Sequence, residues 1–101
     1  MSYKIVITYT KTTDSPDNAF SNIPVLEPYD NVTQEQIDLL KNTYPTQYET
    51  RRIQDQMIMI FTYNSEEDYN AVNNDSIIVD LKARRIAWAE SNKLTFDLRV
   101  V

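Results

Sequence analysis

The stretch RRIQDQMIMIFTYN, residues 51–64, decides how the rest of the chain is interpreted. Its centre, residues 57–61 (MIMIF), contains no polar residue, so a strand formed there is apolar on both of its faces. An antiparallel sheet in a small protein commonly gives one face to water. We therefore expect a second layer, beyond the usual covering helices, on the other face of the sheet that contains this strand.

The neighbouring residues predict that this strand belongs to a hairpin. Residues 47–54 alternate loosely, residues 56–63 form the strongest strand pattern in the chain, and Gln54-Asp55 lies between them as a tight turn. The alternative is one long strand over residues 47–63. Strands usually contain 3–10 residues, so the hairpin is preferred.

Periodicity predicts the remaining elements. Residues 3–10 alternate as a strand, and residues 93–101 alternate as a half-buried terminal strand. Residues 33–44 predict a helix that starts at the N-cap Thr33 and ends at Pro45. A broken helix follows from Ser65 to about residue 90, with its interruption at Asn73-Asn74-Asp75.

The second part of the broken helix carries an apolar stripe. Lys82 and Glu90 are expected to point away from the core. The stripe itself is formed by Ile77, Ile78, Leu81, Arg85 and Trp88.

Residues 11–31 hold three of the four prolines and show no periodicity. Such a long irregular segment within a compact domain is unusual. Because it also carries several apolar residues, we expect a loop that lies over the core. The alternative is a lid, or an arm that reaches a second subunit.

The order of the predicted elements, β-α-β-β-α-β, gives a fold class. It is the order of a ferredoxin-like α+β domain, in which both helices cover one face of a four-stranded antiparallel sheet. We expect residues 1–101 to form one such domain. The other face carries Val6, Ile58 and Ile60, and the simplest cover for it is the same face of a second copy. The sequence therefore predicts a homodimer.

Composition excludes several functional classes. The net charge is −5, which argues against nucleic-acid binding. The chain has no His, Cys or Gly, so we expect no metal site, no cofactor and no glycine-rich phosphate loop. It has no apolar run long enough to cross a membrane and no signal-peptide pattern at its N-terminus, so we expect a cytoplasmic protein without a membrane partner.

The stretch YETRRIQDQMIMIFTYNSEEDYNAV, residues 48–72, resembles a known group of proteins. It has a polar strand, a tight turn, an apolar strand and a Tyr-x-Ser-x-x-x-Tyr entry into a broken helix. Over about residues 47–101 the chain is similar to the dimeric α+β barrel superfamily, typified by antibiotic-biosynthesis-monooxygenase-like domains. The resemblance implies a pocket between the sheet and the helices, and it covers enzymes as well as non-enzymatic binding proteins.

The sequence leaves the function open among three classes and favours the first. The first is a non-enzymatic homodimer that acts by association or by binding a small-molecule ligand. The second is a cofactor-independent monooxygenase-like enzyme, and the third is an acidic inhibitor of another macromolecule. Residues that could line a pocket are Tyr3, Tyr48, Arg52, Tyr63, Arg85 and Trp88.

The arginine in the apolar stripe has two interpretations. Arg85 is expected to bury its stem and pair with a carboxylate such as Glu49 or Asp97. The alternative is an anion site formed by Arg52 and Arg85. Catalytic residues cannot be assigned from the sequence, because a tyrosine acts as an acid or base only if its surroundings shift its pKa.

Overall fold

The computed structural model describes residues 2–26, 29, 31–43 and 45–101. Its strands are β1 (Tyr3–Thr10), β2 (Pro45–Ile53), β3 (Gln56–Tyr63) and β4 (Thr95–Val100). Its α-helices are α1 (Gln34–Asp38), α2 (Glu66–Asn73) and α3 (Ser76–Ser91), with a 3₁₀ helix η1 (Ala19–Asn22) and a π-helix η2 (Leu39–Thr43).

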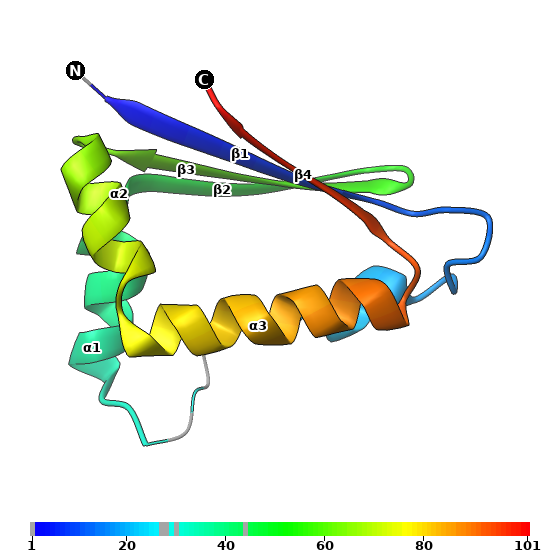
Figure 1. The fold of residues 1–101 in the computed structure, drawn as a ribbon, viewed down its shortest axis with the longest axis horizontal. Helices are drawn as coiled ribbons and strands as arrows, with labels where there is room; N and C mark the ends of the chain where they lie inside the picture. The colour runs from blue at the N-terminus through cyan, green and yellow to red at the C-terminus, as the bar shows by residue number, and fades with distance from the viewer. Residues whose placement is uncertain (1, 27–28, 30, 44) are drawn as a thin grey trace.

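The four strands form one antiparallel sheet in the order β2-β3-β1-β4. All the helices lie on one side of this sheet, and α3 runs beneath it along its length (Figure 1). The opposite side carries no helix or loop of the described chain. This arrangement confirms the predicted ferredoxin-like α+β fold.

The hairpin over residues 47–63 is confirmed. Strands β2 and β3 are joined at Gln54-Asp55, and β2 begins at Pro45, two residues earlier than predicted. Gln54 has a positive φ of 48° and Lys93 one of 58°. In a chain without glycine, these residues occupy the left-handed region that glycine usually fills.

Side-chain caps set the helix boundaries as the sequence predicts. Thr33 Oγ1 accepts a hydrogen bond from the backbone of Gln36 at 3.2 Å, and Ser65 Oγ accepts one from that of Asp68 at 3.2 Å. The broken helix is also confirmed, because Asp75 caps α3 by accepting from the backbone of Ile77 at 2.9 Å. The first helix changes from α to π geometry after Asp38.

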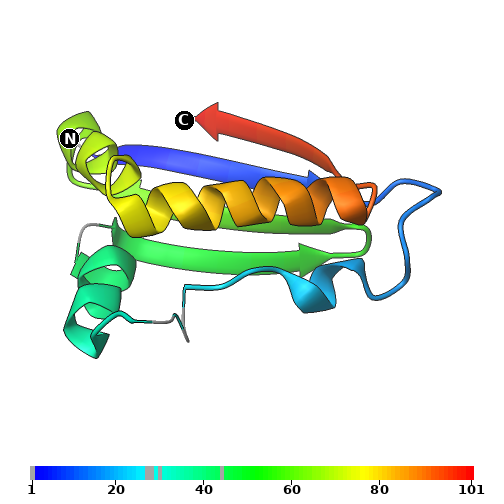
Figure 2. The same ribbon diagram turned by 60° about the horizontal axis from the view of Figure 1, so that its bottom comes forward.

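The helices lie across one face of the sheet (Figure 2), and two hydrophobic clusters pack between them and the strands. Both take the odd-numbered residues of β1 and β3, since alternate side chains of a strand share a face. The first cluster lies near the end of α3 and contains Tyr9, Phe20, Met57, Met59, Trp88 and Ala89. The second involves η2 and α2 and contains Ile5, Leu40, Tyr63 and Val72.

The described part of the segment 11–31 lies on the helix side of the sheet rather than the open side (Figure 1). Its η1 helix buries Ala19 and Phe20, and the Trp88 indole Nε1 donates a hydrogen bond to the Ala19 carbonyl oxygen at 3.0 Å. This part of the segment lies over the core, as expected. Residues 27, 28 and 30, which the same prediction includes, lie outside the described residues.

Strand β4 corrects one prediction. A half-buried strand was expected, but every residue of β4 is exposed, with Phe96 54% exposed. The reason is its position at the edge of the sheet, where it pairs only with β1. The inward face of β4 borders a cavity instead of packed side chains.

Within the described ranges, no helix has the length and apolar character needed to cross a membrane.

Candidate functional site

A cavity with a volume of about 680 Å³ lies between the sheet and α3. Its size falls in the range of small-molecule sites, which is about 300–1,000 Å³. The lining includes members of both hydrophobic clusters, so the cavity occupies the space between them. This is the location that the family resemblance implied.

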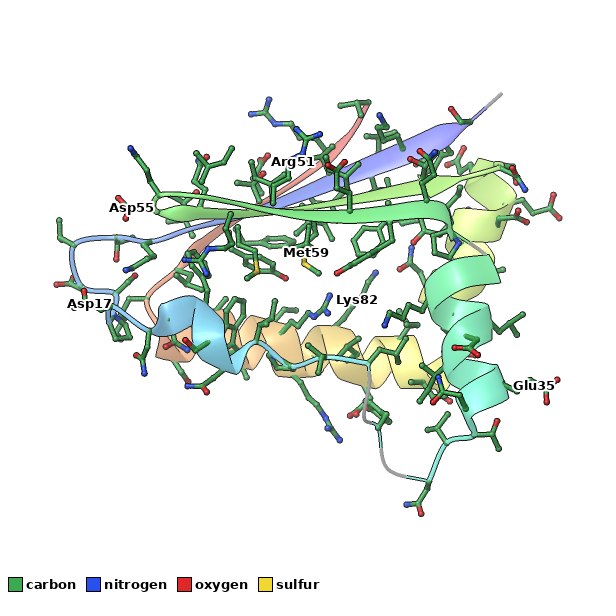
Figure 3. The ribbon with its side chains drawn as sticks, turned by 180° about the vertical axis from the view of Figure 1, so that it is seen from behind. Asp17, Glu35, Arg51, Asp55, Met59 and Lys82 are labelled. Carbon is green, nitrogen blue, oxygen red and sulfur yellow. The ribbon has the colours of Figure 1, made fainter. Side chains whose placement is uncertain are left out.

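The sheet provides an apolar and aromatic ceiling. Ile7 of β1, Phe61 of β3 and Leu98 of β4 line the cavity, and they lie on one face because Ile7 pairs with Leu98 and the neighbouring Ile5 with Phe61. Figure 3 shows Met59 directed from the sheet toward α3, while Arg51 lies on the far side of the sheet. The alternation of β1 and β3 therefore selects which residues reach the cavity.

Helix α3 provides the opposite wall. The residues of α3 that line the cavity are Ile78, Leu81, Lys82, Arg85, Ile86, Ala89 and Glu90. Lys82 and Glu90 are exposed, as expected for residues that point away from the core, but both also border the cavity. Lys82 rises from α3 toward the sheet (Figure 3), and burial lowers its pKa. The stripe at residues 78, 82, 85 and 89 follows helical spacing, so the sequence did contain this signal.

Arg85 is the partly buried charge of the cavity. Its Nε donates to the Pro24 carbonyl oxygen at 2.9 Å, and its Nη1 lies 3.9 Å from the Met59 sulfur. Burial lowers the pKa of Arg85, while the phenols of Tyr9 and Tyr48 act in the opposite direction. The guanidinium therefore stands in a largely apolar environment.

The predicted pairing of Arg85 with a carboxylate is wrong for the part of the chain that the structure describes. Glu49 pairs with Arg51 at 2.7 Å, and Asp97 pairs with Arg99 at 2.8 Å. Both carboxylates lie on the opposite face of the sheet, because even and odd residues of a strand point in opposite directions. Arg85 has no ion pair with any described carboxylate.

Two predicted tyrosines line the cavity. Burial raises the pKa of Tyr63 to about 12, and Tyr69 adds to this shift. Tyr63 is therefore a protonated hydrogen-bond donor at neutral pH rather than a general base. Tyr48 packs edge-on against Phe61 with 4.9 Å between the ring centroids, and its hydroxyl accepts a hydrogen bond from Thr50.

The structure places the other predicted pocket residues elsewhere. Tyr3 packs against Tyr69 at 5.3 Å, the Arg52 guanidinium lies 4.4 Å above the Phe20 ring, and Trp88 is buried in the first cluster. Thus Tyr48, Tyr63 and Arg85 come together at the cavity, and Tyr3, Arg52 and Trp88 do not line it. An anion site formed jointly by Arg52 and Arg85 is not supported.

The open face of the sheet has a distinct pattern. Val6 of β1 pairs with Ile60 of β3, and Ile58 lies two residues along β3, so an apolar row crosses the two central strands. On the edge strands, the Glu49–Arg51 and Asp97–Arg99 ion pairs flank this row. An apolar centre with a polar rim is the usual composition of a protein–protein interface.

No protein-family model matches the sequence, and no curated protein matches it. Solved structures with low sequence identity are similar in fold. A conserved protein of unknown function from Bacteroides thetaiotaomicron VPI-5482, for which an oxidoreductase activity has been suggested, aligns with a TM-score of 0.61 and 10% identity, over 99% of this chain and 95% of its own.

Two further structures bear on the predicted family resemblance. A candidate antibiotic biosynthesis monooxygenase from Chloroflexus aurantiacus J-10-fl has a TM-score of 0.55 and 14% identity, with 100% of this chain and 93% of its own covered. A dimeric ferredoxin-like protein from an uncultured marine organism has a TM-score of 0.55 and 13% identity, with 100% and 89% covered. These likenesses confirm the predicted resemblance at the level of the fold.

Proposed function

We propose that this chain is a cytoplasmic homodimer that binds a small apolar molecule in the cavity between the sheet and α3. The observation that carries the proposal is the cavity itself, which is formed by apolar and aromatic side chains with few polar groups among them. Binding sites for small molecules usually have this composition. In addition, a tightly packed interior would be expected if the domain acted only as a scaffold.

The experiment uses decan-1-ol as a neutral probe and two matched variants of adjacent residues. Ile78 lines the cavity and is partly buried, whereas Val79 is 53% exposed on α3 and does not line it. In Ile78→Phe the larger side chain fills part of the cavity, so calorimetry should show at least about tenfold weaker binding than in the wild type. Val79→Phe should bind as the wild type does. Equal binding by the two variants, or no binding by the wild type, would contradict the proposal.

The open face supports the dimeric part of the proposal. The apolar row of Val6, Ile58 and Ile60 would be covered by the same row of a second copy, and the flanking ion pairs would form the rim. One solved structure with this fold is named as a dimeric protein, which agrees with this arrangement. Two such sheets packed face to face would form a barrel with the cavities outside it.

Solution mass tests the dimer directly. Light scattering should give twice the chain mass of 11.9 kDa for the wild type. Ile60→Asp should give a folded monomer, because a carboxylate at the centre of the interface would be buried without a partner. Val79→Asp adds the same charge on exposed α3 and should remain dimeric. A monomeric wild type at high concentration would refute the dimer while leaving ligand binding to be judged by its own experiment.

A cofactor-independent oxygenase is the second candidate function. It is favoured by the presence of Arg85 and the protonated Tyr63 in one cavity, since these groups could hold an oxygenated aromatic anion. The test is oxygen uptake with a hydroxylated aromatic substrate, compared between the wild type and Tyr63→Phe. Uptake that requires Tyr63 would favour the enzyme, and uptake equal to the buffer rate would exclude it for that substrate class.

A further inference from the structure

The charges that surround the cavity differ in sign from the chain as a whole. Among the described residues that line it, Arg85, Lys82 and Lys41 are basic and Glu90 is acidic. The whole chain, in contrast, has a net charge of −5. Arg85 and Lys82, which border the apolar walls from α3, therefore indicate a preference for an anionic ligand.

Arg85 is the basic group of the cavity whose position is set by a carbonyl oxygen and a sulfur. Its Nε is fixed by the Pro24 carbonyl oxygen at 2.9 Å, and its Nη1 meets only the weak sulfur acceptor of Met59. A guanidinium has five N–H donors, and the described residues offer Arg85 no further acceptor. No fully buried side-chain nitrogen lacks a partner in the described chain, so the unused donors of Arg85 are accessible, and Arg85 lines the cavity.

These unused donors carry an energetic consequence. A partly desolvated cation without a neighbouring anion is less stable than one with a hydrogen-bonded counter-charge. Two parallel N–H groups of a guanidinium match the two oxygens of a carboxylate in one plane. The apolar walls formed by Ile7, Phe61 and Leu98 suit a hydrocarbon chain attached to that carboxylate.

We propose that the cavity binds an aliphatic carboxylic acid, with its carboxylate on the Arg85 guanidinium and its hydrocarbon chain against the apolar walls. This inference rests on the proposed function, because it requires that the cavity binds small molecules, and it adds the chemical class of the ligand. Arg85 is the specificity-determining residue. Lys82, which is more exposed, contributes to the positive potential.

The test compares three probes with the same ten-carbon chain: decanoate, decan-1-ol and decylammonium. Calorimetry on the wild type at neutral pH should show that decanoate binds about tenfold to a hundredfold tighter than decan-1-ol, as one charge-assisted contact predicts. Decylammonium should bind most weakly. Because this comparison needs no variant, it remains decisive even if a substitution at Arg85 prevents folding.

Matched arginine variants then assign the preference to one residue. Arg85→Met should lose the preference for decanoate over decan-1-ol to within about threefold, and Arg85→Lys should retain an intermediate preference because it has no planar fork. Arg84→Met is the control, since Arg84 is exposed, pairs with Asp80 and does not line the cavity. It should keep the full preference.

The outcomes separate this inference from the proposed function. If decan-1-ol and decanoate bind equally well, or if Arg85→Met keeps the preference, the assignment to Arg85 is wrong and the binding cavity stands. A preference that is lost in Lys82→Met but kept in Arg85→Met would likewise overturn it in favour of Lys82. If none of the three probes binds, the inference and the proposed function both fail.

Discussion

The two faces of the central sheet are both apolar, yet they are apolar for different reasons. On the covered face, residues such as Ile5 and Met59 are buried by the chain's own helices, with Ile5 only 1% exposed. On the open face, Val6, Ile58 and Ile60 are screened only by neighbouring strands, and ion pairs flank them. The covered face holds the fold together, and the open face is suited to a second copy.

The two faces also differ in how their arginines are paired. The arginines of the open face, Arg51 and Arg99, are exposed and paired with carboxylates. Arg85 below the covered face is partly buried and has no carboxylate partner among the described residues. An exposed ion pair contributes little to stability. An unpaired buried charge persists more readily where it serves a site, so the covered face combines stability with binding.

The largest expected effect comes from truncating adjacent residues that belong to opposite faces. Ile5→Ala should lower the free energy of unfolding by about 2–5 kcal/mol, because it removes packed methyl groups and leaves a void. Val6→Ala should cost roughly 1 kcal/mol in dilute solution and more when the protein is concentrated. Urea unfolding at two protein concentrations measures both losses.

The dependence on concentration is the informative part of that experiment. The loss caused by Ile5→Ala should be the same at both concentrations, since its neighbours belong to its own chain. If Val6→Ala lowered the free energy of unfolding in dilute solution as much as Ile5→Ala does, the chain itself would have to cover the open face. The contrast between the faces would then disappear.

Alkaline pH gives a smaller effect that should be confined to the covered face. The folded pKa of Tyr63 is about 12 and the ordinary value is 10.0, so the unfolded chain loses this proton first as pH rises. The contribution of the raised Tyr63 pKa to the free energy of unfolding is complete below about pH 10 and is lost as the pH approaches about 12. This contribution is about 2 kcal/mol in total. Tyr63→Phe should remove much of this loss, as measured by urea unfolding at pH 8 and pH 11.5.

Tyr48→Phe provides the control for the alkaline experiment. Tyr48 also borders the cavity, but it is 41% exposed. This variant should retain the wild-type loss of stability between the two pH values. Part of the loss should also remain in Tyr63→Phe, because burial raises the pKa of Tyr9 on the same face. If the stability of Tyr63→Phe depended on pH in the same way as that of the wild type, the alkaline loss could not be attributed to Tyr63.

The fold could be predicted from the sequence because its signals are local. Strand alternation, the caps at Thr33 and Ser65 and the break before Asp75 depend on residues close together in the chain. The turns were harder to predict from the sequence. After α3 the left-handed conformation is taken by Lys93, rather than by the Asn and Asp residues that favour turns. There the backbone of Leu94 donates to the Ala89 carbonyl oxygen, which closes the helix.

The candidate site was predicted only in part, because a cavity depends on how elements are spaced rather than on any one of them. Tyr48, Tyr63 and Arg85 were identified from residue type and face. Trp88 was a candidate for the core as well as for the pocket, because a large aromatic residue on an inward stripe can fill either, and the structure places it in the core. Lys82 was missed because a lysine beside an apolar stripe usually points to water.

The smallest expected effect tests the rim of the open face. Arg51→Gln removes one partner of an exposed ion pair, so the thermal midpoint of the dilute protein should not change measurably. The dimer should respond more strongly, because Glu49 would be left unpaired near a second chain that also carries net negative charge. Sedimentation should therefore show a weaker dimer at low ionic strength, with the difference reduced by salt.

Arg84→Gln is the matched control for this last comparison. Arg84 has nearly the same exposure as Arg51, 58% against 57%, and it also pairs with a carboxylate, but it lies on α3 on the other side of the sheet. The two substitutions change the net charge equally. If only Arg51→Gln weakens the dimer, position on the open face decides the effect. If both weaken it equally, overall charge repulsion is responsible, and the ion pairs are not the rim of an interface.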